Sequence, residues 1–215
     1  MTFRPILQWP HPKLAIQSEA INKFDPVLVQ LVRDMYDTLN ITMGAGLAAP
    51  QIGVHKRVVI LKPHLFGHNN CDPYEGDDRL LVLVNPHLKL KGKKKGWNEE
   101  CLSLPGVTGK VFRNSDVQLV YQTLGGEEKK LDVGWPFSGA LQHECDHLDG
   151  LLFIDRMGKR AAIELKKQFR RKIRLNNPFL KKRPKIKEEK EVIDTRLTHG
   201  PGKRKRDKRK KLRKK

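Results

Sequence analysis

Cysteine is scarce in this chain, which holds Cys71, Cys101 and Cys145 among 215 residues. An odd, widely spaced set offers no disulfide framework, and this fits a reducing compartment. The first residues lack the apolar core of a secretion signal, and they do not resemble an Arg- and Ser-rich transit peptide. Apolar runs long enough to cross a membrane are also missing. We therefore expect a cytoplasmic protein with no membrane partner.

Acidic residues are few in the last part of the chain. Residues 156–215 hold 27 Lys+Arg and 6 Asp+Glu, a net charge of +21, whereas residues 1–155 hold 17 and 18, a net charge of −1. A near-neutral body therefore carries a strongly basic extension. The length allows one domain of ordinary size in addition to that extension.

The extension begins with the pattern of an amphipathic helix at residues 159–175, which Asn176-Asn177-Pro178 should end. Its apolar stripe consists of Ala162, Leu165, Phe169 and Ile173. Residues 181–215 have few hydrophobic side chains, so we expect them to be disordered. We divide the chain into a domain (1–157), a basic amphipathic helix (158–176) and a basic, disordered tail (177–215).

Two histidines stand four residues apart in the stretch 142–150, which reads Q-H-E-C-D-H-L-D-G. If this stretch is helical, His143 and His147 lie one turn apart on one face and could bind the same divalent metal. Glu144 beside them could move a proton to or from a water molecule there. The alternative is a helix that carries two surface histidines and binds no metal.

A metal with two histidine ligands needs a third protein ligand. Some metalloproteases continue as H-E-x-x-H-x-x-G-x-x-H, but Phe153 stands here in place of the third histidine. Others use a later glutamate, and the nearest, Glu164, lies in the basic stretch. Cys101 is the best candidate, because a thiolate binds borderline and soft metals strongly. A free Cys101 could instead act as a nucleophile, although the two histidines favour a metal site.

The rest of the body predicts an α+β fold. Asp25 as N-cap, Pro26 and an apolar repeat at three and four residues predict a helix that ends before Gly44. We expect a polar loop at 67–79 and a hairpin-like, Lys/Gly-rich segment at 89–96. Short apolar runs predict strands at residues 57–61, 80–84, 117–122 and 129–133, the last two joined at Leu124-Gly125-Gly126. The fold expected is a set of antiparallel sheets around the central H-E-x-x-H helix.

Two further segments accompany the histidine motif. Residues 44–51 read G-A-G-L-A-A-P-Q, in which small residues allow close approach to a ligand and Gln51 offers an amide donor. Residues 99–106 read E-E-C-L-S-L-P-G. In this order the three segments resemble the peptide deformylase family, whose pattern is G-φ-G-φ-A-A-x-Q (φ apolar), E-G-C-[LV]-S and Q-H-E-x-D-H-L-x-G. The resemblance covers roughly residues 3–155.

This resemblance implies a metal-dependent hydrolase that removes the formyl group from the N-terminal formyl-methionine of nascent chains and releases formate. It implies that Cys101, His143 and His147 hold the metal, usually Fe2+ in this family, with Zn2+, Ni2+ or Co2+ also accepted. Mixed sulfur and nitrogen ligands suit these metals and exclude Mg2+ and Ca2+.

The resemblance also implies roles in catalysis. Glu144 would take a proton from water and pass it to the departing amine. The side-chain amide of Gln51 and the backbone N–H of Leu102 would stabilise the developing oxyanion, and Gly46 would contact the formyl end of the substrate. The sequence departs from the family where Glu100 replaces the usual Gly. The longer side chain must point away from the site or crowd its entrance, which bears on substrate affinity and not on ligation.

Four residues near these motifs are candidates for substrate binding. Trp97 and Glu99 precede the cysteine, and Gly139 and Ala140 lie about one turn before His143 on the same helix face. The two small residues would leave room, and Trp97 could form a wall. Ordinary helix–strand packing explains these residue types equally well.

The basic tail indicates a second partner. Substrates of such an enzyme emerge from the ribosome, and the tail would bind rRNA, a dense polyanion, since family members dock near the exit tunnel through a C-terminal helix. A solvated tail and a nuclear-import signal are the alternatives. A ribosome- or RNA-binding protein with a vestigial deformylase-like site is the other function class. The intact Gln51, Cys101, His143, Glu144 and His147 favour a working enzyme, which we expect to be a monomer.

Overall fold

The computed structural model describes residues 2–68 and 79–176. In this part of the chain the strands form one five-stranded antiparallel sheet in the order β1-β2-β3-β4-β5. The strands are β1 (Gly46–Ala48), β2 (Val58–Leu61), β3 (Leu81–Glu99), β4 (Gly109–Gln122) and β5 (Glu128–Val133). The helices are α1 (Pro26–Thr42), α2 (Phe137–Leu148), α3 (Phe153–Arg156) and α4 (Lys159–Asn176), with 3-10 turns η1 (Pro12–Ala15), η2 (Ala49–Ile52) and η3 (Pro63–Phe66). The predicted α+β class is confirmed.

The first long helix begins and ends where the sequence predicts. The carboxylate of Asp25 accepts the backbone N–H groups of Val27 and Leu28, at 3.0 and 3.1 Å, and so caps the N-terminus of α1. Pro26 occupies the first turn, where its missing N–H is not needed. The helix ends at Met43, which adopts the left-handed conformation with φ of 54°.

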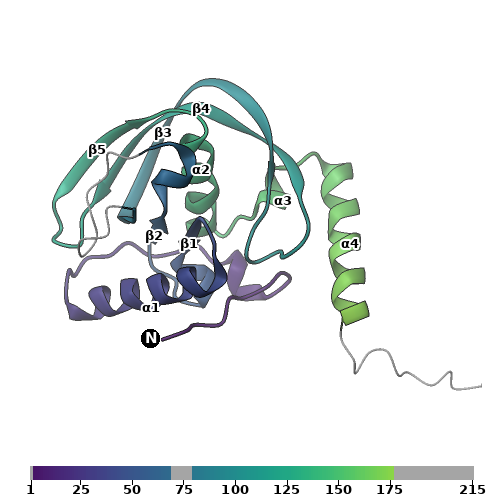
Figure 1. Cartoon of the computed structure of the whole chain (residues 1–215), viewed down its shortest axis with the longest axis horizontal. Coiled ribbons are helices and arrows are strands. Elements are labelled where there is room, and N and C mark those ends of the chain that lie inside the picture. Colours follow the sequence, from purple (N-terminus) through teal and green to yellow (C-terminus); the bar gives the residue numbers. More distant parts are fainter. Residues whose placement is uncertain (1, 69–78, 177–215) are drawn as a thin grey trace, which may run out of the picture.

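Alternation along the strands places the two long helices of the body on opposite faces of the sheet. Val58 and Ile60 of β2 pack in a cluster with α1, whereas Val59 and Leu61 pack in a cluster with α2. All twelve residues of α2 are buried. Figure 1 shows α2 near the middle of the molecule beneath the curved ribbon of β3 and β4, with α1 along the lower side. The predicted central helix is therefore present.

One local prediction was wrong. The Lys/Gly-rich segment 89–96 does not form a hairpin but lies inside β3, and most of its residues pair with β4. The register shifts between Lys91 and Lys94, and Gly92 takes a φ of 68° there. A bulge at this glycine bends the strand without ending it, because the pairing resumes two residues later. The predicted turn at residues 124–126, by contrast, joins β4 to β5.

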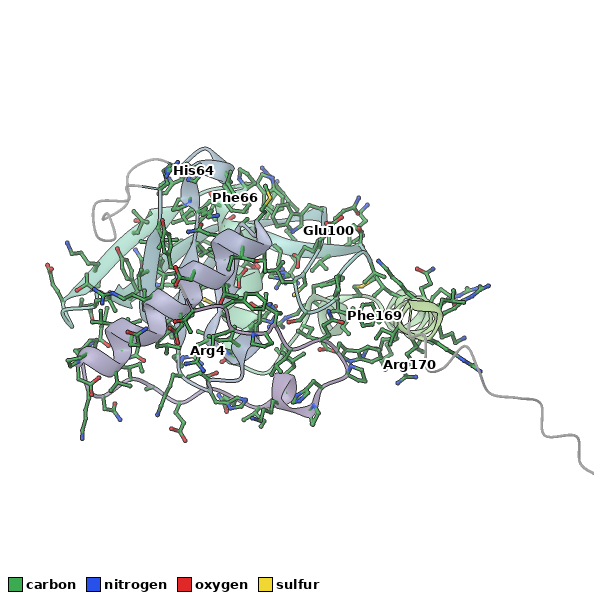
Figure 2. All side chains as sticks on the ribbon, turned by 60° about the horizontal axis from the view of Figure 1, so that its bottom comes forward. Arg4, His64, Phe66, Glu100, Phe169 and Arg170 are labelled. Atoms are coloured by element: carbon green, nitrogen blue, oxygen red, sulfur yellow. The ribbon has the colours of Figure 1, made fainter. Side chains whose placement is uncertain are left out.

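The helix α4 lies beside the body (Figure 1). Leu165 and Phe169 are buried in a cluster that also contains Cys101 and Leu104. Figure 2 shows Phe169 on the side of α4 that faces the body. Ile173, which the predicted stripe included, is 37% exposed. We predicted a boundary after residue 157, between the body and this helix. In the structure, α4 nevertheless contributes side chains to a core cluster of the body.

The predicted tail, and most of the predicted loop at 67–79, fall outside the described residues. Within residues 2–68 and 79–176, the helices are all too short or too polar to cross a membrane.

Candidate metal and active site

The three predicted ligands lie together at the centre of the fold. Single donor atoms of Cys101, His143 and His147 all lie within 4.8 Å of one another. The two histidines project from one face of α2, one turn apart, and Cys101 comes from the turn that follows β3. The Cys101 Sγ atom is 3.4 Å from Nε2 of His147. A strand end and a buried helix thus bring a thiol and two imidazoles to one point.

A buried carboxylate fixes the orientation of His143. Its Nδ1 atom lies 2.6 Å from Oε2 of Glu99, so the ring donates through Nδ1 and presents Nε2 on its other side. Burial alone would raise the pKa of Glu99, but hydrogen bonds with His143 and Arg113 outweigh burial and lower this pKa to about 2. Burial and the charge of His143 lower the pKa of His147 well below its usual value, which keeps that imidazole neutral.

Arg113 of β4 connects this carboxylate to a second one. It donates to Glu99 from Nε at 2.8 Å and from Nη2 at 3.0 Å, and to Asp146 from Nη1. Asp146, on α2, also accepts from Arg156. Buried charges paired in this way hold β4, α2 and the end of β3 in one arrangement.

Glu99, which we predicted to bind substrate, uses its carboxylate to bind other side chains of the protein. Its side chain is 2% exposed, and both oxygens are bound by His143, Arg113 and the indole N–H of Trp97. It lines the cavity, but no oxygen is left free for a substrate. We assign it the positioning of His143 instead. Sequence reasoning missed this because the pairing depends on the register of β3 and β4.

Glu144 lies beside the ligands and has an unsatisfied oxygen. Its Oε2 atom is buried without a hydrogen-bond partner. Burial raises the pKa of this carboxyl to about 7. A Cβ atom at Gly46 would lie 2.5 Å from Oε1 of Glu144, so a glycine in the first motif leaves room for this carboxylate. An unpartnered carboxyl with such a pKa suits a group that exchanges a proton with a water molecule.

Gln51 directs its amide into the same site. Its Oε1 atom accepts the backbone N–H of Ala48 at 2.9 Å, which fixes the flat amide. The amide nitrogen then lies 3.2 Å from Oγ of Ser103 and 3.6 Å from Sγ of Cys101. Ser103 had no predicted role, although it belongs to the second motif. Its hydroxyl holds the donor end of Gln51 next to the cysteine.

A cavity of about 500 Å3 opens onto these groups. Trp97 and Ala140 line it, together with Gly46 and Leu102. Gly139 does not: a Cβ atom there would lie 2.9 Å from the Trp97 ring and 3.1 Å from the ring of Trp135, so this glycine allows the two indoles to pack on α2. Sequence reasoning also missed two apolar lining residues, Leu61 and Phe66.

The residues present fit a divalent metal. One sulfur and two nitrogen donors lie close enough to bind one ion, and this mixed set suits a borderline transition metal. The unpartnered oxygen of Glu144 beside them has space for a water molecule within the cavity. Fold and site together define a metal-dependent hydrolase with one cysteine and two histidine ligands.

Comparison with known proteins identifies the family. The polypeptide deformylase family model matches residues 3–162, and the chain belongs to this family. It is 38% identical over 157 residues to a peptide deformylase of Acidobacterium capsulatum, covering 73% of this chain and 88% of that protein. It is 36% identical over 170 residues to a peptide deformylase of Campylobacter jejuni, covering 79% and 94%. The crystal structure of a peptide deformylase from Legionella pneumophila superposes with a TM-score of 0.71 at 30% identity, covering 82% of this chain and all of that one.

Proposed function

We propose that this protein is a peptide deformylase that removes the formyl group from N-terminal formyl-methionine and releases formate. The observation that carries this function is the convergence of Cys101, His143 and His147 with Glu144 and Gln51, of which all but His147 line one cavity. Amide hydrolysis needs an activated water, a group that moves protons and donors for the oxyanion. The site offers residues for each of these tasks.

Cys101, His143 and His147 would hold the metal, which we propose to be Fe2+, with Zn2+, Ni2+ or Co2+ as substitutes. A bound divalent metal supplies Lewis acidity, which polarises a carbonyl and makes water more acidic. Glu99 supports this arrangement because it keeps the proton of His143 on Nδ1. The neutral ring of His147 needs no deprotonation before it binds.

Glu144 would take a proton from the attacking water and deliver it to the nitrogen of the departing amine. Burial raises the pKa of this carboxyl, which makes it a better proton acceptor than an exposed glutamate. The amide N–H of Gln51 and the backbone N–H of Leu102 would stabilise the negative charge that develops on the formyl oxygen. Gln51 is already oriented for this by Ala48 and Ser103, so little reorganisation is needed.

The methionine side chain would occupy the apolar part of the cavity. Leu61, Phe66, Trp97 and Ala140 are among the apolar residues that line it. Phe66 stacks on Phe137 of α2 at 5.8 Å between ring centroids, which fixes this wall. An unbranched thioether fits such an irregular apolar space.

The basic tail would bring the enzyme to its substrates. Residues 177–215 hold 18 Lys+Arg and 5 Asp+Glu, so they would bind rRNA through its phosphates. We propose a cytoplasmic location for the enzyme, close to emerging chains.

Formate release from a short formyl-Met peptide tests the proposed function. The protein loaded with Fe2+ without oxygen should release formate, and the acetyl-Met analogue should react far more slowly. Chelation should abolish turnover, and readdition of Fe2+, Zn2+, Ni2+ or Co2+ in parallel samples should restore it to different extents. Metal-loaded, folded protein that leaves every formyl peptide intact would show that the site is vestigial.

A further inference from the structure

Exposed residues at the mouth of the site cavity include a single carboxylate. The exposed members of the cavity lining are Met43, Asn98, Glu100, Pro105 and Gly106. Glu100 follows the last residue of β3 and directly precedes the ligand Cys101. Figure 2 shows Glu100 on the same upper side of the molecule as Phe66, which also lines the cavity. The side chain that replaces the family's usual glycine is therefore part of the entrance.

The charge of Glu100 is not neutralised by the rest of the lining. No Lys or Arg lines this cavity in the described part of the chain. The other two lining carboxylates lie deeper: Glu99 is bonded to Arg113, and Glu144 is buried. Lys172 of α4 donates to the carbonyl oxygens of Pro105 and Gly106, at 3.1 and 3.3 Å, but does not line the cavity.

One hydrogen bond holds the Glu100 carboxylate in place. The hydroxyl of Thr108 donates to its Oε1 atom at 2.9 Å. Among the described residues this is its only hydrogen bond, and it forms no ion pair with them. An oriented carboxylate with a second oxygen available can accept a hydrogen bond from an ammonium or guanidinium group.

We propose that Glu100 is a specificity-determining residue, which favours formyl-methionine substrates with Lys or Arg at the second or third position. This inference rests on the proposed function. The formyl group must reach Glu144 at the inner end of the cavity, so the following residues of the substrate leave through the mouth and pass Glu100. A cationic side chain there gains a charged hydrogen bond, and an acidic one is repelled. Because the group is exposed, the effect on kcat/KM is modest, about two- to tenfold between Lys and Glu substrates.

The experiment compares formyl-Met peptides that differ only in Lys, Gln or Glu at the second or the third position. For the metal-loaded wild type, the ratio of kcat/KM for Lys over Glu peptides should be about two- to tenfold at low salt at one of these positions. It should approach one at 1 M salt, where screening acts over about 3 Å. Glu100→Gln keeps the shape and should bring the ratio close to one. Glu100→Lys should reverse the preference.

Glu128→Gln and Glu128→Lys are matched controls, because Glu128 is an exposed residue of the edge strand β5 and does not line the cavity. Their ratios should equal that of the wild type. The role of Glu100 would be overturned if the ratio of kcat/KM for Lys over Glu peptides were the same in Glu100→Gln as in the wild type. It would also be overturned if the Glu128 variants changed this ratio as much as the Glu100 variants do. Failure of the wild type to release formate from any peptide would instead reject the proposed function.

Discussion

His143 Nδ1 and Glu99 Oε2, 2.6 Å apart, connect the metal helix to the end of strand β3. Glu99 stands two residues before Cys101, so one short piece of chain supplies a ligand and also orients another ligand from α2. Arg113 on the neighbouring strand binds the same carboxylate through two nitrogens. The geometry of the three donors thus depends on correct pairing of β3 with β4 as well as on α2.

Glu99→Gln should weaken metal binding by about 10- to 100-fold. The amide lacks the negative charge of the carboxylate that accepts the hydrogen bond from Nδ1–H of His143. The measurement is competition between the protein and a chelator of known affinity. Glu128→Gln, on β5, serves as the control and should bind metal as the wild type does. Unchanged affinity in Glu99→Gln would show that Arg113 and the fold alone position His143.

Glu144→Gln should retain the metal and lose turnover by about 10²–10⁴-fold, since an amide cannot take and return a proton. Metal content and formate release are measured on the same sample. The unpartnered Oε2 atom makes this replacement structurally mild, because no hydrogen bond in the described protein is lost there. Equal loss of metal and of activity would assign Glu144 to the structure of the site instead.

The two histidine ligands could be predicted from sequence because their geometry relative to each other is local. A spacing of four residues on a helix places His143 and His147 on one face whatever surrounds them. The capped helix α1 and the β4–β5 hairpin are likewise specified by neighbouring residues, as the Asp25 cap shows. The third ligand, Cys101, was predicted from the chemistry of its thiol and from the motif around it, because its distance along the chain carries no information on its position.

What the sequence could not give depends on contacts between distant segments. The Lys and Gly residues between positions 89 and 96 are compatible with a turn and with a bulged strand. They form a bulged strand because they pair with β4, which is distant in the sequence. The need for glycine at position 46 follows from the approach of Glu144, and that at position 139 from the packing of Trp97 and Trp135. The roles of Glu99 and of Gly139 were missed for this reason.

Phe169→Ala should lower the free energy of unfolding by about 3–5 kcal/mol, because Phe169 is 1% exposed in the cluster that contains Cys101 and Leu104. Ile173→Ala, one turn further along the same predicted stripe, should cost less than about 1 kcal/mol, since this side chain remains partly exposed. Urea unfolding of both variants checks this. Similar losses in the two would mean that α4 is not held through Phe169.

Asp34→Asn should reveal a stabilising ion pair that depends on pH. Burial tends to raise the pKa of Asp34, but hydrogen bonds from Gln30 and Arg4 outweigh burial and lower it. A lowered folded-state pKa gives stability that is present above the unfolded value of about 3.9 and is lost as pH falls. The wild type should exceed the variant by about 1 kcal/mol at pH 7, because Arg4 is half exposed, and this gap should close below pH 4. A gap that stays constant in urea unfolding between pH 7 and pH 3 would contradict this assignment.

Deletion of residues 177–215 should separate catalysis from localisation. The deletion leaves α4 intact, so turnover of a short free formyl-Met peptide should stay nearly unchanged. Binding to ribosomes should fall sharply, and wild-type binding should weaken steeply with salt, because each neutralised phosphate releases counterions. A tethered tail also raises the local concentration of the enzyme at emerging chains.

The measurement is ribosome co-sedimentation across a salt series, with a full-length control in which the 11 Lys and Arg of residues 203–215 become Gln. If this control binds as tightly as the wild type, or if wild-type binding ignores salt, the charge of these last residues is not what holds the enzyme to the ribosome.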